Sequence, residues 1–305
     1  SRTKHRKKNI PQRNWKTKTM ASLCLNDILT TPVITVKADT NVHHALEMMR
    51  KQQISALVVM KDTTPVGIFT ERDAVLIAYK HHDPLRLEVE EVMGKPLLTA
   101  LPNLDYRDGY RLINEKRVRH LVVTDEQGSL VGIVTEGDFL KHLGNEFLVR
   151  FKEVGAVMNH NVLSLPSDAQ VDDAVRMMTR EHISCVVIEE QGKPVGIFTE
   201  RDLVRLETTA GVMPRKPLSL YMSQPVSTVN DQTPLPEALR IMDDSKIRRL
   251  VVVDQNNAIT GLVTRHDVVK QLYNRHVEIL LESLRQRELE LAKAQAELKA
   301  ERELH

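Results

Sequence analysis

The amino-acid sequence predicts an α+β/α-β fold in which four copies of one β-α-β-β-α unit follow one another and a long helix comes last. Two observations predict the repeats. A short glycine-containing segment occurs four times at almost constant spacing, and the same series of apolar patterns precedes each occurrence. A third observation predicts the last helix, because residues 262–305 contain neither glycine nor proline.

The repeated segment follows the pattern Gly-x-x-Thr-x-x-Asp. Its four copies read PVGIFTERD, LVGIVTEGD, PVGIFTERD and ITGLVTRHD, and successive glycines are 65, 64 and 65 residues apart. The glycines are Gly67, Gly132, Gly196 and Gly261. A constant period of this length indicates a tandem structural repeat.

Each unit is predicted to begin with a short β run and an amphipathic helix. In the first copy the helix places Val42, Ala45, Leu46 and Met49 on one face, at the spacing i, i+3, i+4, i+7. A buried strand, the glycine-containing strand and a second helix complete about 60 residues. One unit of this size buries too little apolar surface to be stable alone, so we expect the units to pair. The first β runs are 33–36, 97–100, 162–165 and 226–229, and the second runs are 57–60, 121–123, 186–188 and 250–253.

The residues before the second β run show which copies correspond. Copies one and three have small residues there, in Ile54-Ser55-Ala56 and Ile183-Ser184-Cys185, whereas copies two and four have Val118-Arg119-His120 and Ile247-Arg248-Arg249. The order is therefore ABAB. It predicts two modules of two copies each, with a short linker at residues 141–153. The predicted domains are 1–21 (a basic flexible arm), 22–145, 153–273 and 274–305 (a helix).

These motifs resemble the cystathionine-β-synthase (CBS) domain, and each AB pair resembles a Bateman module. The resemblance covers about 250 of the 305 residues. It implies a non-catalytic regulatory chain that binds an adenine nucleotide. AMP, ADP or ATP are the first choices, and S-adenosylmethionine or a cyclic dinucleotide are further possibilities. The chain also resembles the sensory regions of bacterial signalling proteins such as diguanylate cyclases.

The resemblance implies a ligand between the two copies of a module. The expected residues of the first site are Thr35, Ile54, Ser55, Ala56, Thr135 and Asp138, and those of its counterpart in the second module are Ser164, Ile183, Ser184, Cys185, Thr264 and Asp267. Mirror-related sites use Thr99 with Thr70 and Asp73, and Ser227 with Thr199 and Asp202. We rank the mirror sites lower because bulky basic residues approach them. Those residues, Arg119, His120, Arg248 and Arg249, are expected to point at phosphates.

The Thr and Asp residues have a second interpretation, and so do the basic residues. Thr and Asp stand where a strand becomes a helix, which is the arrangement of a capping box and needs no ligand. A carboxylate has two oxygens, so capping and ribose binding can hold together. The basic residues could instead form a solvated or ion-paired edge.

Composition limits the other functions. The net charge is +2, but residues 1–19 hold eight Lys or Arg and no acid, which leaves about −6 for the rest of the chain. Only Cys24 and Cys185 are present, so disulfides are not expected and a cytoplasmic location fits best. No apolar run is long enough to span a membrane. No catalytic or metal-binding motif is present.

The C-terminal helix shows a seven-residue period. Val277, Leu284, Leu291 and Leu298 occupy one heptad position, whereas the second apolar position is weak because it includes Arg287 and Glu301. We expect a coiled-coil-like pairing that makes a homodimer and leads to an output domain after residue 305; packing back on the body is the alternative. Three functions remain open: a sensor that controls such a domain, a stand-alone adaptor or cytosolic transporter tail, and a nucleic-acid binder that uses the basic arm.

Overall fold

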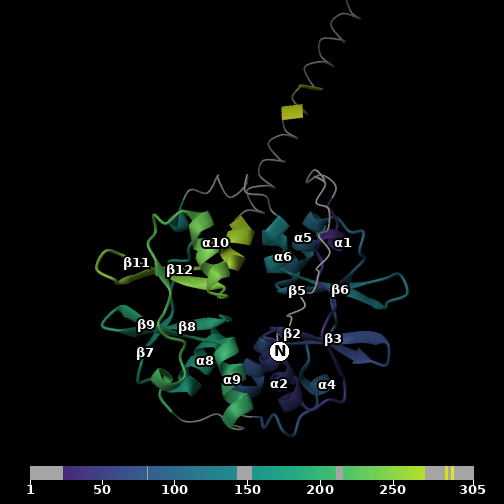
Figure 1. Ribbon diagram of the computed structural model, residues 1–305, viewed down its shortest axis with the longest axis horizontal. Helices are drawn as coiled ribbons and strands as arrows, with labels where there is room; N and C mark the ends of the chain where they lie inside the picture. The colour runs from purple at the N-terminus through teal and green to yellow at the C-terminus, as the bar shows by residue number, and fades with distance from the viewer. Residues whose placement is uncertain are drawn as a thin grey trace, which may run out of the picture.

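The computed structural model describes residues 23–80, 82–142, 153–210 and 216–271, together with residues 286–287 and 290–291. These residues form four three-stranded sheets, one for each copy. In each sheet the first strand runs parallel to the middle strand, and the third strand is antiparallel to it. Figure 1 shows the four copies as quarters of one body.

Each copy has the order β-α-β-β-α that the sequence predicts. Copies one and two together are called module 1, and copies three and four module 2. Copy one consists of β1 (Thr35–Lys37), α2 (Val42–Gln52), β2 (Ala56–Lys61), β3 (Thr64–Thr70) and α3 (Glu71–Tyr79). Copy two consists of β4 (Thr99–Ala100), α5 (Tyr106–Lys116), β5 (His120–Thr124), β6 (Leu130–Thr135) and α6 (Glu136–His142).

Module 2 repeats this order. Copy three consists of β7 (Ser164–Pro166), α8 (Val171–Arg180), β8 (Cys185–Glu190), β9 (Lys193–Thr199) and α9 (Glu200–Ala210). Copy four consists of β10 (Thr228–Val229), α10 (Leu235–Asp244), β11 (Arg249–Val253) and β12 (Ile259–Thr264), followed by helical residues 265–271. A short helical turn precedes each copy; these turns are α1 (Leu25–Ile28), α4 (Val89–Val92), η2 (Val154–Ala156) and η3 (Leu218–Leu220).

Local sequence explains the first helix of a copy. Asn41 caps α2, since its side chain accepts a hydrogen bond from the backbone N–H of His43 at 2.9 Å. The helix ends at Gln53, whose φ of 55° is left-handed. The face predicted for α2 is buried, with Val42, Ala45 and Leu46 all 0% exposed. The prediction for this helix is therefore confirmed.

The repeated glycines lie where the segment before a neighbouring copy crosses the third strand. A Cβ on Gly67 would stand 2.2 Å from the Sδ of Met93, and a Cβ on Gly196 would stand 2.3 Å from the Sδ of Met222. A larger residue at either position would require the methionine side chain to move. Close approach, rather than a special backbone angle, accounts for these glycines.

Copies one and three face each other, as do copies two and four. Val75 of α3 lies in the hydrophobic core of copy three, and Val204 of α9 lies in the core of copy one. Val269 of copy four lies in the core of copy two. These three valines occupy the same position of the repeat, the fifth residue after its Thr. The modules therefore share their hydrophobic cores.

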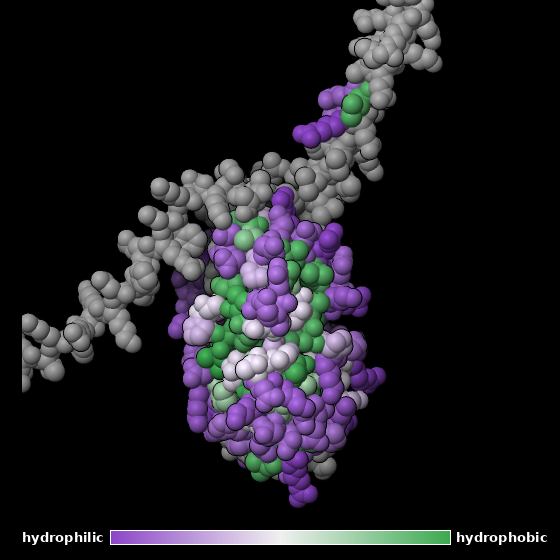
Figure 2. Space-filling model, turned by 90° about the vertical axis from the view of Figure 1, so that its right-hand side faces the viewer, coloured by the Kyte–Doolittle hydropathy of each residue, from purple (hydrophilic) through white to green (hydrophobic). Residues whose placement is uncertain are grey.

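Cys24 and Cys185 are free thiols. Among the described helices, none is long and apolar enough to cross a membrane. Figure 2 looks onto the outer side of module 1, where hydrophobic residues occupy the middle and hydrophilic residues surround them. The basic arm lies outside the described residues, and so does the proposed C-terminal pairing, apart from four residues of its helix.

Candidate functional site

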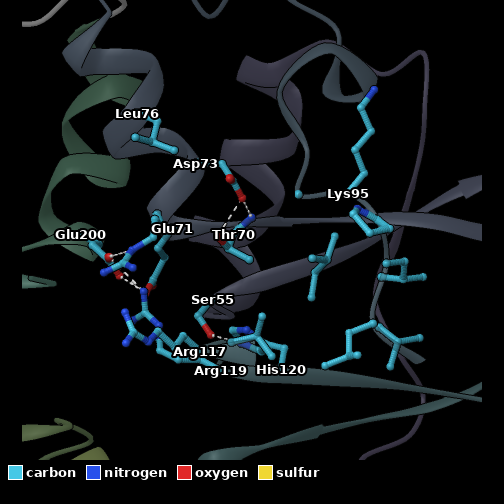
Figure 3. A pocket seen from close by; sticks show the side chains of 18 residues that line it. Ser55, Thr70, Glu71, Asp73, Leu76, Lys95, Arg117, Arg119, His120 and Glu200 are labelled. Atoms are coloured by element: carbon cyan, nitrogen blue, oxygen red, sulfur yellow. Dashed lines mark hydrogen bonds and ion pairs between the residues drawn. The ribbon is translucent and has the colours of Figure 1, made fainter. Parts of the chain in front are cut away.

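Cavity 1 lies between copies one and two and has a volume of about 320 Å³. The start of α3 contributes Thr70 and Asp73, while the segment before β4 contributes Leu97 and Leu98. The segment before β5 contributes residues 117–120. Helix α9 of module 2 reaches this cavity with one residue, Glu200 (Figure 3). The cavity thus joins both copies of module 1 and touches module 2.

Cavity 2 occupies the equivalent place in module 2 and has a volume of about 250 Å³. Thr199 and Asp202 come from the start of α9, and Ser227 comes from the segment before β10. Residues 245–249, which precede and begin β11, form another wall. Glu71 of module 1 lines it in the way that Glu200 lines cavity 1. The two cavities are therefore related by the internal repeat.

A central cavity of about 470 Å³ lies where all four copies meet. Thr135 and Thr264 line it, as do Ser55 and Ser184. It therefore collects hydroxyl groups from both of the sites that the sequence ranked first.

The four Thr-x-x-Asp elements form the capping boxes that the alternative interpretation predicts. At the start of α3 the Oδ2 of Asp73 accepts hydrogen bonds from the backbone N–H and the hydroxyl of Thr70, both at 2.7 Å. The same pair of bonds recurs at Asp138, Asp202 and Asp267. Capping therefore uses one carboxylate oxygen and leaves the other for a further partner.

The second carboxylate oxygen of the capping Asp has different surroundings in the two cavities. In cavity 2 the Oδ1 of Asp202 accepts a hydrogen bond from the Ser223 hydroxyl at 2.8 Å and lies 3.5 Å from Arg205. In cavity 1 no hydrogen bond among the described residues uses the Oδ1 of Asp73. Leu76 stands in cavity 1 at the helix position that Arg205 holds in cavity 2. Asp73 is thus the carboxylate more available to a ligand.

Burial raises the pKa of Asp73 from 3.8 to about 6, and the charge of Glu200 adds to the rise. The hydrogen bonds from Thr70 and the charge of Arg72 oppose it. At neutral pH the group is therefore mostly ionised but incompletely solvated. A pair of hydroxyl donors from a ligand would stabilise this carboxylate.

Two buried glutamates bind four arginines across the module boundary. Glu200, which is 2% exposed, lies 2.7 Å from Arg119 and 3.3 Å from Arg72. Glu71, which is 5% exposed, lies 3.0 Å from Arg201 and 3.5 Å from Arg248. These six residues are called the Arg–Glu cluster below.

Burial shifts the pKa values of Arg119 and Arg248, and the glutamates compensate for it to different extents. Burial opposes the charge of Arg119, but Glu200, Glu136 and Glu71 together outweigh burial, and the pKa of Arg119 is raised. Burial lowers the pKa of Arg248, and Glu71 compensates only in part. We expected Arg119 and Arg248 to point at phosphates; the structure instead directs them at glutamates, which agrees with the ion-paired alternative. Both still line the cavities.

His120 and Arg249 occupy the next position and behave differently. The Nε2 of His120 is 3.1 Å from the Ser55 hydroxyl, whereas Arg249 donates to the backbone carbonyl of Ser184 at 2.8 Å. Burial lowers the pKa of His120 to about 3, and Arg119 lowers it further. His120 is therefore neutral at physiological pH, and the expectation that it points at a phosphate stays a prediction.

Copies two and four contact each other through a histidine–glutamate pair at the same repeat positions. His266 Nδ1 is 2.6 Å from Glu136 Oε1, and this hydrogen bond raises the pKa of His266. Gly137 stands where copies one and three have an arginine. Arg265 pairs with Asp243 of its own copy rather than with copy two.

The strand register shows that Thr99 and Ser227, predicted for the two mirror sites, are not equivalent positions of the repeat. Thr99 pairs with Val122, and its equivalent in copy four is Thr228, which pairs with Val251. Ser227 therefore corresponds to Leu98 rather than to Thr99. Since successive strand residues face opposite sides, Ser227 and Leu98 line the cavities and Thr99 does not.

The remaining predicted residues divide between the cavities. Thr70, Asp73, Ser55, Arg119 and His120 line cavity 1, and Thr199, Asp202, Ser227, Arg248 and Arg249 line cavity 2. None of the three cavities described is lined by Thr35, Ile54, Ala56, Thr99, Asp138, Ser164, Ile183, Cys185 or Asp267.

Sequence reasoning missed the glutamates of the cluster. Glu71 and Glu200 follow the Thr of the repeated segment in copies one and three, whereas copy four has Arg265 there. The identity of TERD in the two A copies was the available signal. It was assigned to capping and ribose binding alone.

Comparison with known proteins identifies the repeats. The family model described as "CBS domain" matches residues 25–79, 89–145, 154–208 and 218–274. The protein MJ1404 of Methanocaldococcus jannaschii is 26% identical over 264 residues, which cover 81% of this chain and 61% of that relative. A 33.4 kDa protein of the ribosomal RNA operon of Thermofilum pendens is 32% identical over 195 residues, which cover 59% of this chain and 63% of that protein. The chain therefore spans about 60% of the length of these curated relatives.

Solved structures share the four-copy fold. The crystal structure of MJ1225 from Methanocaldococcus jannaschii, proposed as an archaeal homologue of γ-AMPK, has a TM-score of 0.72 and 22% sequence identity. It covers 82% of this chain and 99% of its own. A Pyrococcus horikoshii protein has a TM-score of 0.57 at 20% identity, covering 82% of this chain and 100% of its own. At these identities the likeness shows the fold alone.

These relatives and structures are archaeal, so the suggested likeness to bacterial diguanylate cyclases stays a prediction. The four matches to the family model coincide with the four β-α-β-β-α units of the structure. The chain belongs to the CBS domain family.

Proposed function

We propose that this chain is a regulatory module that binds an adenine nucleotide in cavity 1 and a second one in cavity 2. The observation that carries the proposal is the available Oδ1 of Asp73, which faces a cavity between two paired copies. A carboxylate there can accept hydrogen bonds from both hydroxyls of a ribose. The capping bonds to Thr70 hold its Oδ2 in place meanwhile.

The walls of cavity 1 suit the other parts of a nucleotide. Ile68, Leu98, Val118 and Val122 offer apolar surface for the faces of a purine ring. The N-terminus of α3 supports a nearby negative charge. Lys95 and the arginines of residues 117–119 line the same cavity and can approach a phosphate.

This proposal reverses the ranking made from the sequence. The first-ranked sites pair Ser55 with Thr135 and Ser184 with Thr264, and these residues line the central cavity. Asp138 is only 7% exposed, and Asp267 lines none of the three cavities. Those sites stay predictions, and we propose cavities 1 and 2 before them.

Regulation of a partner completes the proposal. The helix that starts at Arg265 lies beside the central cavity and leads towards the C-terminal segment. We propose that ligand binding is transmitted through it to an attached or separate output domain, with homodimer formation by the segment after residue 273. A cytoplasmic location belongs to the same proposal.

Replacing Asp73 by asparagine is expected to weaken AMP binding in cavity 1 at least tenfold. A hydrogen bond to a charged group contributes about 1.5–3 kcal/mol, and about 1.4 kcal/mol corresponds to a factor of ten. Isothermal titration calorimetry with AMP, ADP, ATP and S-adenosylmethionine measures the affinities of wild type and variant. The dissociation constant assigned to cavity 1 should rise at least tenfold in the variant.

The matched control for this experiment is Asp267→Asn. Asp267 makes the same two capping bonds, from the Thr264 backbone at 2.9 Å and its hydroxyl at 2.6 Å, but it lines neither cavity 1 nor cavity 2. The control should bind AMP as wild type does. Loss of binding in the control, with Asp73→Asn unchanged, would contradict the proposed site and favour the first-ranked one.

A further inference from the structure

The Arg–Glu cluster belongs to both cavities at once. Glu71 and Glu200 each line cavity 1 and cavity 2, although they come from different modules. Their carboxylates are almost fully buried, at 5% and 2% exposure. A charge in this position acts on ligands at both sites, because buried charges are screened less by solvent than exposed ones.

The cluster has the symmetry of the repeat. Glu71 of copy one binds an arginine of copy three and one of copy four, while Glu200 of copy three binds an arginine of copy one and one of copy two. Each glutamate therefore occupies arginines on the opposite module. The arginines are Arg72, Arg119, Arg201 and Arg248.

The glutamates use only part of each guanidinium group. Arg119 contacts Glu200 through Nη2, and Arg248 contacts Glu71 through Nη1. Other donors of the same groups can still bind a phosphate oxygen. Within the cluster, four arginines against two glutamates leave two positive charges for the two cavities, about one for each, and the single phosphoryl group of AMP, at about −1.5 to −2, already offsets that share. Further phosphates would add negative charge next to two buried carboxylates.

We propose that Glu71 and Glu200 are specificity-determining residues that make both cavities select the less phosphorylated of otherwise identical nucleosides. Each glutamate disfavours ligand charge by Coulomb repulsion and by occupying arginines that a phosphate would bind. Each acts on the cavity of the other module as well as its own. This inference rests on the proposed nucleotide site and names the ligand charge that the site accepts.

The uncharged ligand adenosine provides the internal reference. Its affinity is insensitive to the charge of the cluster, whereas AMP, ADP and ATP are increasingly sensitive to it. Binding of the four ligands is measured by calorimetry in Asp73→Asn and Asp202→Asn backgrounds, which are expected to weaken cavity 1 and cavity 2 respectively. In both backgrounds we expect AMP to bind more tightly than ATP.

Glu200→Gln and Glu71→Gln remove one negative charge each with little change of shape. Either substitution is expected to tighten AMP binding about tenfold in both cavities and ATP binding by more, with adenosine changed less than twofold. Glu200→Asp and Glu71→Asp keep the charge and should retain the preference for AMP over ATP. Thermal melting shows that each variant is folded at the temperature of the titration.

Glu136→Gln is the matched control. Glu136 occupies the same repeat position in copy two, but it pairs with His266 and, of the three cavities described, lines the central one alone. Its substitution should change AMP affinity by less than threefold. An equal effect of Glu136→Gln and Glu200→Gln would overturn the proposal, since it would reveal a general effect of net charge.

Two outcomes separate this inference from the proposed function. If adenosine and AMP both bind, but ATP binds as tightly as AMP and the glutamine variants change nothing, the charge selection is wrong and the nucleotide site stands. If none of the four ligands binds the wild-type chain, the proposed function fails and this inference fails with it. The ligand series on wild type decides this even where a glutamine variant does not fold.

Discussion

Replacing Glu200 by alanine is expected to lower the free energy of unfolding by about 3 kcal/mol, the lower end of the range for breaking a buried ion pair. Glu200 is almost fully buried, and its carboxylate binds Arg119 and Arg72 of the other module. Alanine leaves both guanidinium groups without this partner. Their side chains are 31% and 41% exposed, so water recovers part of the loss.

Chemical denaturation measured by circular dichroism gives this free energy, and Glu136→Ala is the matched variant. Glu136 stands at the same repeat position, but its ion-pair partner is His266, whose side chain is 48% exposed. The control is expected to cost about 1 kcal/mol or less, as partly exposed pairs do. Equal losses in the two variants would show that the cluster contributes nothing beyond an ordinary surface pair.

Replacing Val204 by aspartate is expected to have the larger effect, at about 4 kcal/mol or more, because it buries a charge without a partner. Val204 belongs to α9 of copy three but is 3% exposed within the core of copy one. The new carboxylate would face apolar side chains of the other module. Denaturation and size-exclusion chromatography together should show loss of the packing between the modules.

Leu220→Asp tests whether the buried position of Val204, rather than the introduction of an aspartate as such, causes the loss of stability. Leu220 is in the same module, but 63% of it is exposed. The substitution at Leu220 should change the free energy of unfolding by less than about 0.5 kcal/mol. If Val204→Asp is equally mild, α9 does not hold the modules together as the structure indicates.

The repeat order and the buried helix faces could be predicted because both are local patterns. The four-residue face of α2 follows directly from the spacing of Val42, Ala45, Leu46 and Met49. The Thr-x-x-Asp capping boxes were also visible, since a cap depends on residues three positions apart. Nothing distant in the chain is needed to recognise either feature.

The contacts between modules could not be predicted in the same way. Val75 and Val204 read as ordinary apolar helix residues, yet each packs in a core that is formed mainly by another copy. Glu71 and Arg201 are 130 positions apart, and no local pattern pairs them. The choice of partner depends on which copies face each other, which a repeat period does not determine.

We propose the opposite ranking of the sites for a related reason. We judged the mirror sites by the bulk of Arg119 and Arg248, but ion pairs draw these side chains towards the module boundary. The register error at Ser227 had a simpler cause, since a shift of one residue moves a strand side chain to the opposite face. Both points concern side-chain direction rather than the fold.

A crystal structure of this chain grown with AMP tests nucleotide binding in cavity 1 most directly. We predict AMP between copies one and two, with both ribose hydroxyls within hydrogen-bond distance of Asp73 Oδ1 and the phosphate near the start of α3. AMP bound instead beside Asp138 or Asp267, or an empty cavity 1 at saturating AMP, would contradict the proposed site.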